Sequence, residues 1–336
     1  MKIGVRVDGG PDIGFGHLMR SKALTEVLKN QDHIVDIATA TPQATQSVFS
    51  DIGEIRIIEL PSRSDPEPFI DWLDTGQPDI VFTDAYPVDT EYQQAIKNQV
   101  PLAVLQDDNR HAVCADLFIN GNLYATDLDY EFVGEPPDQC LGAEYVLLRK
   151  EIRELAKEEP PWREEPKRAI VLMGGSDIAN LTPTILRAFD GINIDVDAIV
   201  GPGFSDKQEQ TVREAAAGIS PTVSVVRDPD DLANRIFQAD FAVSTASSTT
   251  YELLALGTPV ISIPVVDNQK MIAEALDTNN CGIVLKDEVR STKLKKAIRR
   301  YFNNQELRKR YTNISQKIVD GEGVKRVRNN IINLAK

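Results

Sequence analysis

Short runs rich in valine and isoleucine alternate with longer amphipathic stretches, and this alternation limits the fold more than any other feature of the chain. In the first half the apolar runs are IGVRV, HIVDIAT, IRIIEL, DIVFTD, LAVLQD and DLFIN. Helical patterns such as His17–Leu28 and Thr90–Asn98 lie between several of them. Strands that alternate with helices indicate a parallel sheet covered by helices.

The alternation pauses at residues 157–166, where three prolines stand among charged residues, and this composition predicts a linker or an exposed loop. It resumes with AIVLM, VDAIV, VSVV, FAVST and PVISI and ends in a helical C-terminal stretch. The sequence therefore predicts two doubly wound, Rossmann-like α/β domains, residues 1–156 and 167–336. Ligands of such sheets bind at the carboxyl ends of the strands, so we expect a cleft between two facing domains.

Length and composition exclude several classes of protein. A chain of 336 residues that is 42% hydrophobic can bury a large core. No apolar run approaches the ~20 residues of a membrane span, so we expect no stable membrane insertion. The N-terminus lacks a signal-peptide profile, and the three cysteines form no CxxC pair. These features predict a cytoplasmic protein without disulfides or a zinc site.

The charge is unevenly distributed. Net charge is −14, but the stretch Arg290–Lys336 has 14 basic and three acidic residues, which is +11 and leaves −25 for the rest. The basic residues interleave with apolar ones at helical spacing, so we interpret them as solvated helix faces. The acidic body argues against nucleic acid as the main partner. Oligomeric state is left open by the sequence.

A glycine-rich turn follows the first strand and leads to a histidine. Because glycine permits tight turns, Gly14 and Gly16 can bring the backbone close to a ligand. His17 then stands at a helix start, where the helix dipole favours a bound anion and a neutral imidazole that accepts a proton. Met19 occupies the place of the third glycine of a GxGxxG fingerprint, which disfavours a nicotinamide enzyme.

Polar residues also follow two later strands of the first domain. Asp84 and Tyr86 come after DIVFTD, and Asp107, Asp108 and Arg110 come after LAVLQD. The aspartate pair suggests a metal, but no further ligand stands at a fitting spacing, so we expect none. Loop capping and an ion pair with Arg110 are both open alternatives for these carboxylates.

Small and polar residues follow three strands of the second domain. A glycine-rich turn after the first strand is a candidate phosphate nest, and two serines after FAVST can cap a helix. We expect a helix to begin after each of these turns, where its N-terminus can stabilise a diphosphate without metal. A glutamate one turn into that helix could bind ribose hydroxyls or simply favour the helix dipole. The candidate binding residues are Gly174, Gly175, Ser176, Ser247, Ser248, Glu252, Asn268 and Gln269.

Taken together, the motifs resemble a known family. In chain order they are GFGHLMR, TDAY, QDDNRH, LGAEYVLLRKE, MGGSD, ASSTTYELLALGTPVISIPVVDNQ and DGEGVKRV. They are similar to the UDP-sugar hydrolase of pseudaminic acid biosynthesis (PseG-type) and its spore-coat polysaccharide relatives (SpsG-like), which belong with the GT-B nucleotide-sugar enzymes.

The resemblance implies a GT-B-like pair of domains, with the nucleotide held mainly by the second, and a role in surface-polysaccharide or nonulosonic-acid biosynthesis. It makes His17 the catalytic base and Tyr86 and Asn268 catalytic residues. It places Glu252 at the ribose and Ser247 and Ser248 at the diphosphate. Arg20, in the histidine motif, is placed among the substrate-binding residues. The implied substrate is a UDP-linked amino or acetamido sugar, hydrolysed with inversion and without cofactor or metal.

Two other functions are weighed against hydrolysis. A GT-B glycosyltransferase would use the same donor site and a hydroxyl acceptor in place of water. A nucleotide-binding protein without catalysis would keep the nucleotide site, although the histidine in its glycine turn argues against it.

Overall fold

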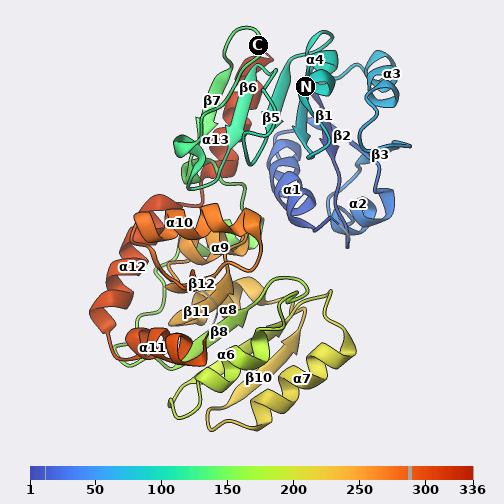
Figure 1. The fold of residues 1–336 in the computed structure, drawn as a ribbon. Helices are drawn as coiled ribbons and strands as arrows, with labels where there is room; N and C mark the ends of the chain where they lie inside the picture. Colours follow the sequence, from blue (N-terminus) through green and yellow to red (C-terminus); the bar gives the residue numbers. More distant parts are fainter. Residues whose placement is uncertain (12, 287–289, 336) are drawn as a thin grey trace. The chain divides into compact units, whose positions relative to one another are not determined.

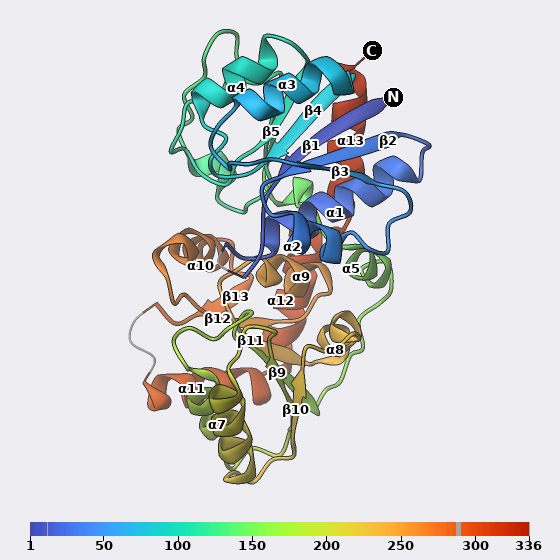
Figure 2. The same ribbon diagram turned by 90° about the vertical axis from the view of Figure 1, so that its right-hand side faces the viewer.

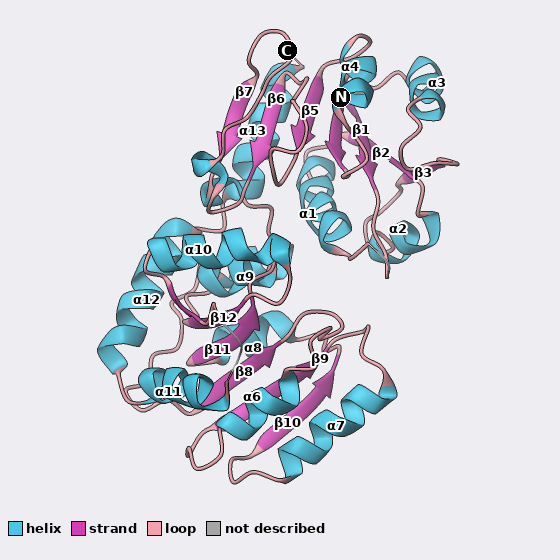
Figure 3. Cartoon of the chain, in the orientation of Figure 1, coloured by secondary structure: helices cyan, strands magenta, loops and turns pink. Residues whose placement is uncertain are grey.

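The computed structural model describes residues 1–11, 13–286 and 290–335. The chain divides into two compact units. Unit 1 comprises Met1–Lys150 together with the C-terminal segment from Glu322, and unit 2 comprises Glu151–Gly321. Each unit is a parallel sheet covered by helices, as expected (Figures 1 and 3). Among the described residues no helix is long and apolar enough to cross a membrane.

Unit 1 contains a seven-stranded sheet with the order β3-β2-β1-β4-β5-β6-β7, and all paired strands are parallel. Its strands are β1 (Lys2–Val7), β2 (Ile34–Thr39), β3 (Arg56–Glu59), β4 (Ile80–Asp84), β5 (Leu102–Leu105), β6 (Leu117–Asn120) and β7 (Asp138–Leu141). Its helices are α1 (Gly16–Lys29), α2 (Pro42–Val48), α3 (Glu67–Gly76), α4 (Thr90–Lys97), the 3-10 turns η1 (Ala125–Asp127) and η2 (Ala143–Tyr145), and α13 (Gly323–Leu334).

Both faces of this sheet are covered, which explains why its strands read as apolar runs. On one face Ile3, Val5 and Val7 of β1 pack with buried residues of α1 and α13. On the other face α3 and α4 supply a second apolar cluster that includes Trp72 and Tyr92. Residues of β4 are buried throughout.

Unit 2 contains a six-stranded parallel sheet with the order β10-β9-β8-β11-β12-β13. Its strands are β8 (Arg168–Leu172), β9 (Asp195–Val200), β10 (Val223–Arg227), β11 (Phe241–Thr245), β12 (Val260–Ile263) and β13 (Gly282–Val284). Its helices, seen from a second side in Figure 2, are α5 (Lys150–Leu155, which begins at the last residue of unit 1), α6 (Thr182–Ala188), α7 (Asp206–Ala217), α8 (Leu232–Gln238), α9 (Thr249–Ala255), η3 (Asp267–Gln269), α10 (Lys270–Thr278), α11 (Ser291–Phe302) and α12 (Gln305–Ile318).

Two domain boundaries differ from those that the sequence predicts. The segment 157–166 is irregular, but it belongs to unit 2, where the buried guanidinium of Arg308 donates to the carbonyl oxygens of Arg163 and Glu164. The last helix, α13, belongs to unit 1 because its apolar stripe is buried in that core. The chain therefore returns to its first unit at the end.

The basic C-terminal stretch folds as amphipathic helices, and α11 shows the pattern most clearly. Its apolar residues Leu294, Ile298 and Tyr301 are buried in the core of unit 2, while Lys296 and Arg299 are exposed. The interpretation of this charge as solvated helix faces is confirmed for α11.

Candidate active site

The glycine turn after β1 brings α1 against the sheet. Gly14 has φ +94°, a conformation that L side chains rarely adopt, and its N–H donates to the carbonyl of Gly10 at 2.7 Å. A Cβ on Gly9 would stand 2.6 Å from the side chain of Leu18. Gly16 then opens α1 and His17 follows in its first turn. The glycine turn therefore fixes the position of the His17 backbone, from which the imidazole extends.

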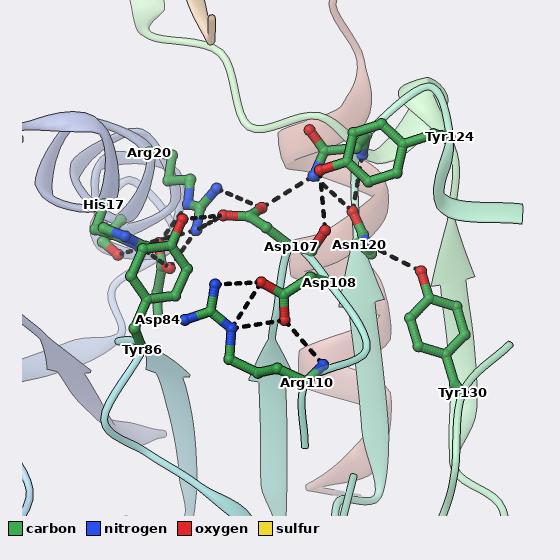
Figure 4. Close-up of polar contacts among 12 residues, drawn as sticks. His17, Arg20, Asp84, Tyr86, Asp107, Asp108, Arg110, Asn120, Tyr124 and Tyr130 are labelled. Carbon is green, nitrogen blue, oxygen red and sulfur yellow. Dashed lines mark hydrogen bonds and ion pairs between the residues drawn. The ribbon is translucent and has the colours of Figure 1, made fainter. Parts of the chain in front are cut away.

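The imidazole of His17 is held by Asp84, the last residue of β4 (Figure 4). Nδ1 lies 2.6 Å from Oδ1 of Asp84, and the two side chains are 10% and 0% exposed. Because a carboxylate only accepts hydrogen bonds, Nδ1–H is the donor and Nε2 carries the lone pair. The same arrangement orients histidine bases in hydrolases, where the carboxylate stabilises the imidazolium that forms. The buried carboxylate of Asp84 therefore acts on His17 in addition to the helix dipole. The sequence did not indicate this partner.

Arg20, one turn further along α1, bridges two aspartates. Its Nε donates to Oδ2 of Asp84 at 2.6 Å, and its Nη1 donates to Oδ1 of Asp107 at 2.8 Å. Its Nη2 contacts both carboxylates. The sequence placed Arg20 among the substrate-binding residues, whereas here its guanidinium is engaged by protein carboxylates.

Tyr86 lies against the imidazole. The rings of His17 and Tyr86 meet edge to face, with centroids 4.6 Å apart and an interplanar angle of 87°. The Tyr86 hydroxyl donates to Oδ2 of Asp107 over 3.5 Å, and the guanidinium of Arg110 lies 4.5 Å from the Tyr86 ring centroid. Burial, reinforced by the negative charge of Asp107, raises the pKa of Tyr86 to about 12. The phenol therefore stays protonated at neutral pH and acts as a donor.

The two adjacent aspartates after β5 have separate partners. Asp107 accepts from Arg20 and from the amide of Asn122 at 3.0 Å. Asp108 pairs with Arg110 instead, in contacts of 2.8 and 2.9 Å from Nε. One of the two alternatives, an ion pair with Arg110, therefore holds for Asp108. Neither carboxylate belongs to a metal-binding cluster, because the described residues contain no group of three or more potential ligands.

A small cavity adjoins this cluster. His17, Arg20, Tyr86, Asp107 and Arg110 are among the residues that line it. Its volume is about 10 Å³, which is about the space that one water molecule requires. Polar side chains such as those of His17 and Tyr86 and apolar ones such as those of Val104 and Leu105 line it together. The base, the phenol and a water-sized space thus occur together in unit 1.

Asp84 and Asp107 make the protein sensitive to acid. Burial by itself raises the pKa of Asp84, but Arg20 and then His17 hold that pKa well below its ordinary value, and Arg20 likewise lowers the pKa of Asp107. The unfolded chain therefore binds more protons near pH 4, so the stabilisation is complete above about pH 5 and declines as the pH falls. We expect the free energy of unfolding, measured in urea, to fall more steeply between pH 5 and pH 3 in the wild type than in Asp84→Asn. Parallel slopes would contradict the pairing.

In unit 2 the candidate residues gather at the carboxyl edge of three neighbouring strands. Gly174, Gly175 and Ser176 follow β8, Ser247 and Ser248 follow β11, and Asn268 and Gln269 follow β12. Strands β8 and β11 flank the point where the strand order reverses, which is where such sheets bind ligands. Gly174 has φ +74°, and a Cβ there would lie 3.8 Å from Oγ1 of Thr245. The sheet order thus brings together residues that are 95 positions apart.

One expectation for unit 2 is wrong. The glycine turn at Gly174 does not lead directly into a helix, because α6 begins only at Thr182. The carboxylate of Asp177 accepts from the N–H groups of Leu181 and Thr182 at 2.9 and 2.8 Å. An aspartate of the protein therefore occupies the helix start that was expected to face the diphosphate.

The remaining candidates have distinct surroundings. Ser248 is exposed at the start of α9, and Glu252 lies half-buried one turn later. Asn268 is exposed in η3. The side-chain oxygen of Gln269 accepts from the N–H of Val265 at 2.9 Å, so this residue also fixes its own loop.

Two important residues of unit 1 were given no role from the sequence. Asp84 carried a weak signal, since a polar residue ends an otherwise apolar strand. Asn122, which holds Asp107, carried none, because nothing in its local pattern indicates a partner 15 residues away.

Comparisons with known proteins agree with the two-unit α/β fold. The glycosyltransferase family 28 C-terminal domain matches residues 169–327. The chain is 23% identical over 339 residues to the spore coat polysaccharide biosynthesis protein SpsG of Bacillus subtilis (strain 168), covering 97% of this chain and 96% of that protein. It is 27% identical over 277 residues to UDP-2,4-diacetamido-2,4,6-trideoxy-beta-L-altropyranose hydrolase of Campylobacter jejuni, covering 81% of this chain and 95% of that protein.

The chain is therefore similar to SpsG-like and PseG-like proteins over most of its length. A solved structure of MurG from Acinetobacter baumannii shares the fold, with a TM-score of 0.72 and 13% identity. The match covers 99% of this chain and 100% of MurG.

Proposed function

We propose that this SpsG-like and PseG-like chain is a UDP-sugar hydrolase. Its substrate would be a UDP-linked amino or acetamido deoxysugar, cleaved to UDP and free sugar in surface-polysaccharide or nonulosonic-acid biosynthesis. The names of the two relatives support this class of reaction. The observation that carries the proposal is the pair of His17 and Asp84 beside a water-sized cavity.

The chemistry requires one proton acceptor and a leaving group. Nε2 of His17 removes a proton from water while the water oxygen forms a bond to the anomeric carbon. The bond from that carbon to the diphosphate oxygen breaks, and UDP leaves with the electron pair. Asp84 stabilises the imidazolium, and general-base catalysis of this kind contributes typically 10²–10⁴-fold. A single displacement inverts the anomeric configuration.

Tyr86 is suited to orient the attacking water. Its single O–H donates to Asp107, so its oxygen can accept a hydrogen bond from the water, and its ring is held between His17 and Arg110. We assign it the role of fixing the water lone pair towards the anomeric carbon. Orientation of this kind lowers the entropic part of the barrier.

We assign nucleotide binding to unit 2, in line with its family 28 C-terminal domain match. Ser247 and Ser248 would contact the diphosphate, Asn268 and Gln269 its leaving oxygen, and Glu252 the ribose hydroxyls. The turn from Gly174 to Ser176 adjoins Thr245 of the neighbouring strand and would border the phosphates. Backbone N–H and hydroxyl donors can stabilise a departing diphosphate without a metal.

The ribose assignment predicts a change in binding alone. Glu252→Gln should raise KM for the UDP-sugar about 10- to 100-fold, since a hydrogen bond to a charged group contributes roughly 1.5–3 kcal/mol. Because the ribose is remote from the bond that breaks, kcat should change less than about threefold. Steady-state kinetics give both constants. A loss confined to kcat would place Glu252 elsewhere in the mechanism.

A GT-B glycosyltransferase is the second candidate, favoured by the family 28 domain match. The two functions separate in an assay without acceptor, with a panel of UDP-, CMP- and GDP-sugars. Hydrolysis predicts stoichiometric UDP release with multiple turnovers from one UDP-sugar. Release only after adding a hydroxyl acceptor would establish transfer. UDP binding without turnover of any sugar nucleotide would instead indicate a non-catalytic binding protein.

A further inference from the structure

Arg20 forms two forks, one to the buried carboxylate of Asp84 and one to the half-buried carboxylate of Asp107. Nε and Nη2 face the oxygens of Asp84, while Nη1 and Nη2 face those of Asp107, in four contacts between 2.5 and 3.0 Å. Its side chain is 23% exposed, against 0% for Asp84 and 17% for Asp107. A planar guanidinium matches carboxylates in this way, and a lysine ammonium does not.

The guanidinium also lies close to the proposed base. Nη2 of Arg20 is 2.9 Å from Nδ1 of His17. Nδ1 donates to Asp84 and Nη2 carries only hydrogens, so the two atoms meet as neighbouring charges and not as a hydrogen-bonded pair. The guanidinium therefore sets a positive charge beside the imidazole.

With a neutral imidazole, Asp84, Asp107 and Arg20 together carry a surplus of one negative charge. Removing Arg20 and Asp107 together leaves the same sum, because one positive and one negative charge are lost. What such a double change alters is the charge beside the ring, since it removes the guanidinium that lies 2.9 Å from Nδ1.

We propose that Arg20 is a positioning residue of the His17–Asp84 pair, not a ligand of the sugar nucleotide. It fixes both carboxylates and places a positive charge 2.9 Å from Nδ1 of the imidazole. Through Asp107 it also fixes Tyr86, whose hydroxyl donates to that carboxylate. This inference rests on the proposed hydrolase function, because it assigns a task within that site.

The other charged and titratable groups around the imidazole are few and can be held constant. Tyr86 follows β4, and Arg110 and His111 stand after β5 and line the same cavity. Arg110 is paired with Asp108, and Tyr86 remains protonated. A change confined to Arg20 and Asp107 therefore isolates the bridge.

The test uses Arg20→Gln combined with Asp107→Asn, because Arg20→Gln alone leaves the two carboxylates together. Removing the positive charge 2.9 Å from the ring outweighs removing the carboxylate, which does not touch the ring. In a plot of log(kcat/KM) against pH, the midpoint of the acid limb should therefore shift to higher pH by about one unit. KM at high pH should stay within about twofold of the wild type.

Arg20→Lys should leave the midpoint of the acid limb unchanged and lower kcat about tenfold. The lysine keeps the positive charge but cannot form paired hydrogen bonds to both carboxylates.

Arg235 offers a matched control in unit 2. Its guanidinium also bridges two aspartates, Asp231 at 2.6 Å and Asp197 at 3.0 Å, with a similar side-chain exposure of 26%. Arg235→Gln combined with Asp197→Asn should leave the pH profile unchanged.

The inference would be overturned if the acid limb of Arg20→Gln/Asp107→Asn had the same midpoint as that of the wild type. A KM raised more than about tenfold at unchanged kcat would also overturn it, since Arg20 would then bind substrate.

A second readout separates this inference from the proposed function. The imidazole of His17 can be followed by NMR, with its signal assigned by its loss in His17→Asn. Its titration midpoint should rise in Arg20→Gln/Asp107→Asn whether or not a sugar nucleotide is hydrolysed. An unchanged midpoint would contradict the role of Arg20, while absent UDP release by the wild type would contradict the hydrolase alone.

Discussion

Replacing His17 with asparagine should lower the rate of UDP release by about 10²–10⁴-fold, the usual contribution of a general base. The asparagine amide still offers a donor towards Asp84, so the buried carboxylate keeps a partner and the fold is retained. Affinity for UDP should stay within about twofold, because the nucleotide is assigned to unit 2. Stopped-time assays of UDP release and calorimetric titration with UDP measure the two effects.

His33→Asn provides the control for this experiment. His33 stands in the turn between α1 and β2 and has no part in the proposed site. It should keep wild-type turnover. If His17→Asn also kept it, the histidine would not be the base and the mechanism would fail. A parallel loss of UDP affinity in His17→Asn would show that the histidine binds the nucleotide.

Asp84→Asn is expected to have the second largest effect. An amide in place of the carboxylate can donate to Nδ1, which leaves the proton on Nε2 and removes the base. We expect kcat to fall roughly 10²–10⁴-fold, as with the corresponding change in serine proteases. The variant also takes one of two carboxylates from Arg20, which should lower the free energy of unfolding by about 3 kcal/mol.

Asp240→Asn separates the two consequences of Asp84→Asn. Asp240 is also buried, and it accepts from the backbone N–H groups of Lys167 and Arg168 and from Arg163. Its replacement should cost comparable stability without changing kcat. If Asp84→Asn lost stability and kept its activity, Asp84 would be a structural ion-pair partner only.

The fold was predictable because buried parallel strands leave a strong pattern. The strands β1, β4 and β11 are buried and rich in apolar residues, and each was found from that pattern. The sheet-edge strands β7 and β13 were missed, since they have only four and three residues and include half-exposed positions. The placement of α13 depends on which core its apolar stripe enters, and no local pattern records that.

The site was predictable where it depends on the backbone and less so where it depends on partners. The glycine turn and the helix start located His17 because both are local features. The pairing of Asp84 with His17 joins residues 67 positions apart through the adjacency of β1 and β4. The same is true of Arg20, which was expected to bind substrate and whose partners are two aspartates. Asp177 likewise caps α6 in a place where a phosphate was expected.

The most direct test of the proposed mechanism is isotope incorporation from water. The chain is incubated with the UDP-sugar that it turns over in ¹⁸O-labelled water, without acceptor, and the products are analysed by mass spectrometry. Attack by water at the anomeric carbon predicts label in the free sugar and none in UDP, with incorporation lost in His17→Asn. Label in the phosphate of UDP, or no free sugar at all, would contradict it.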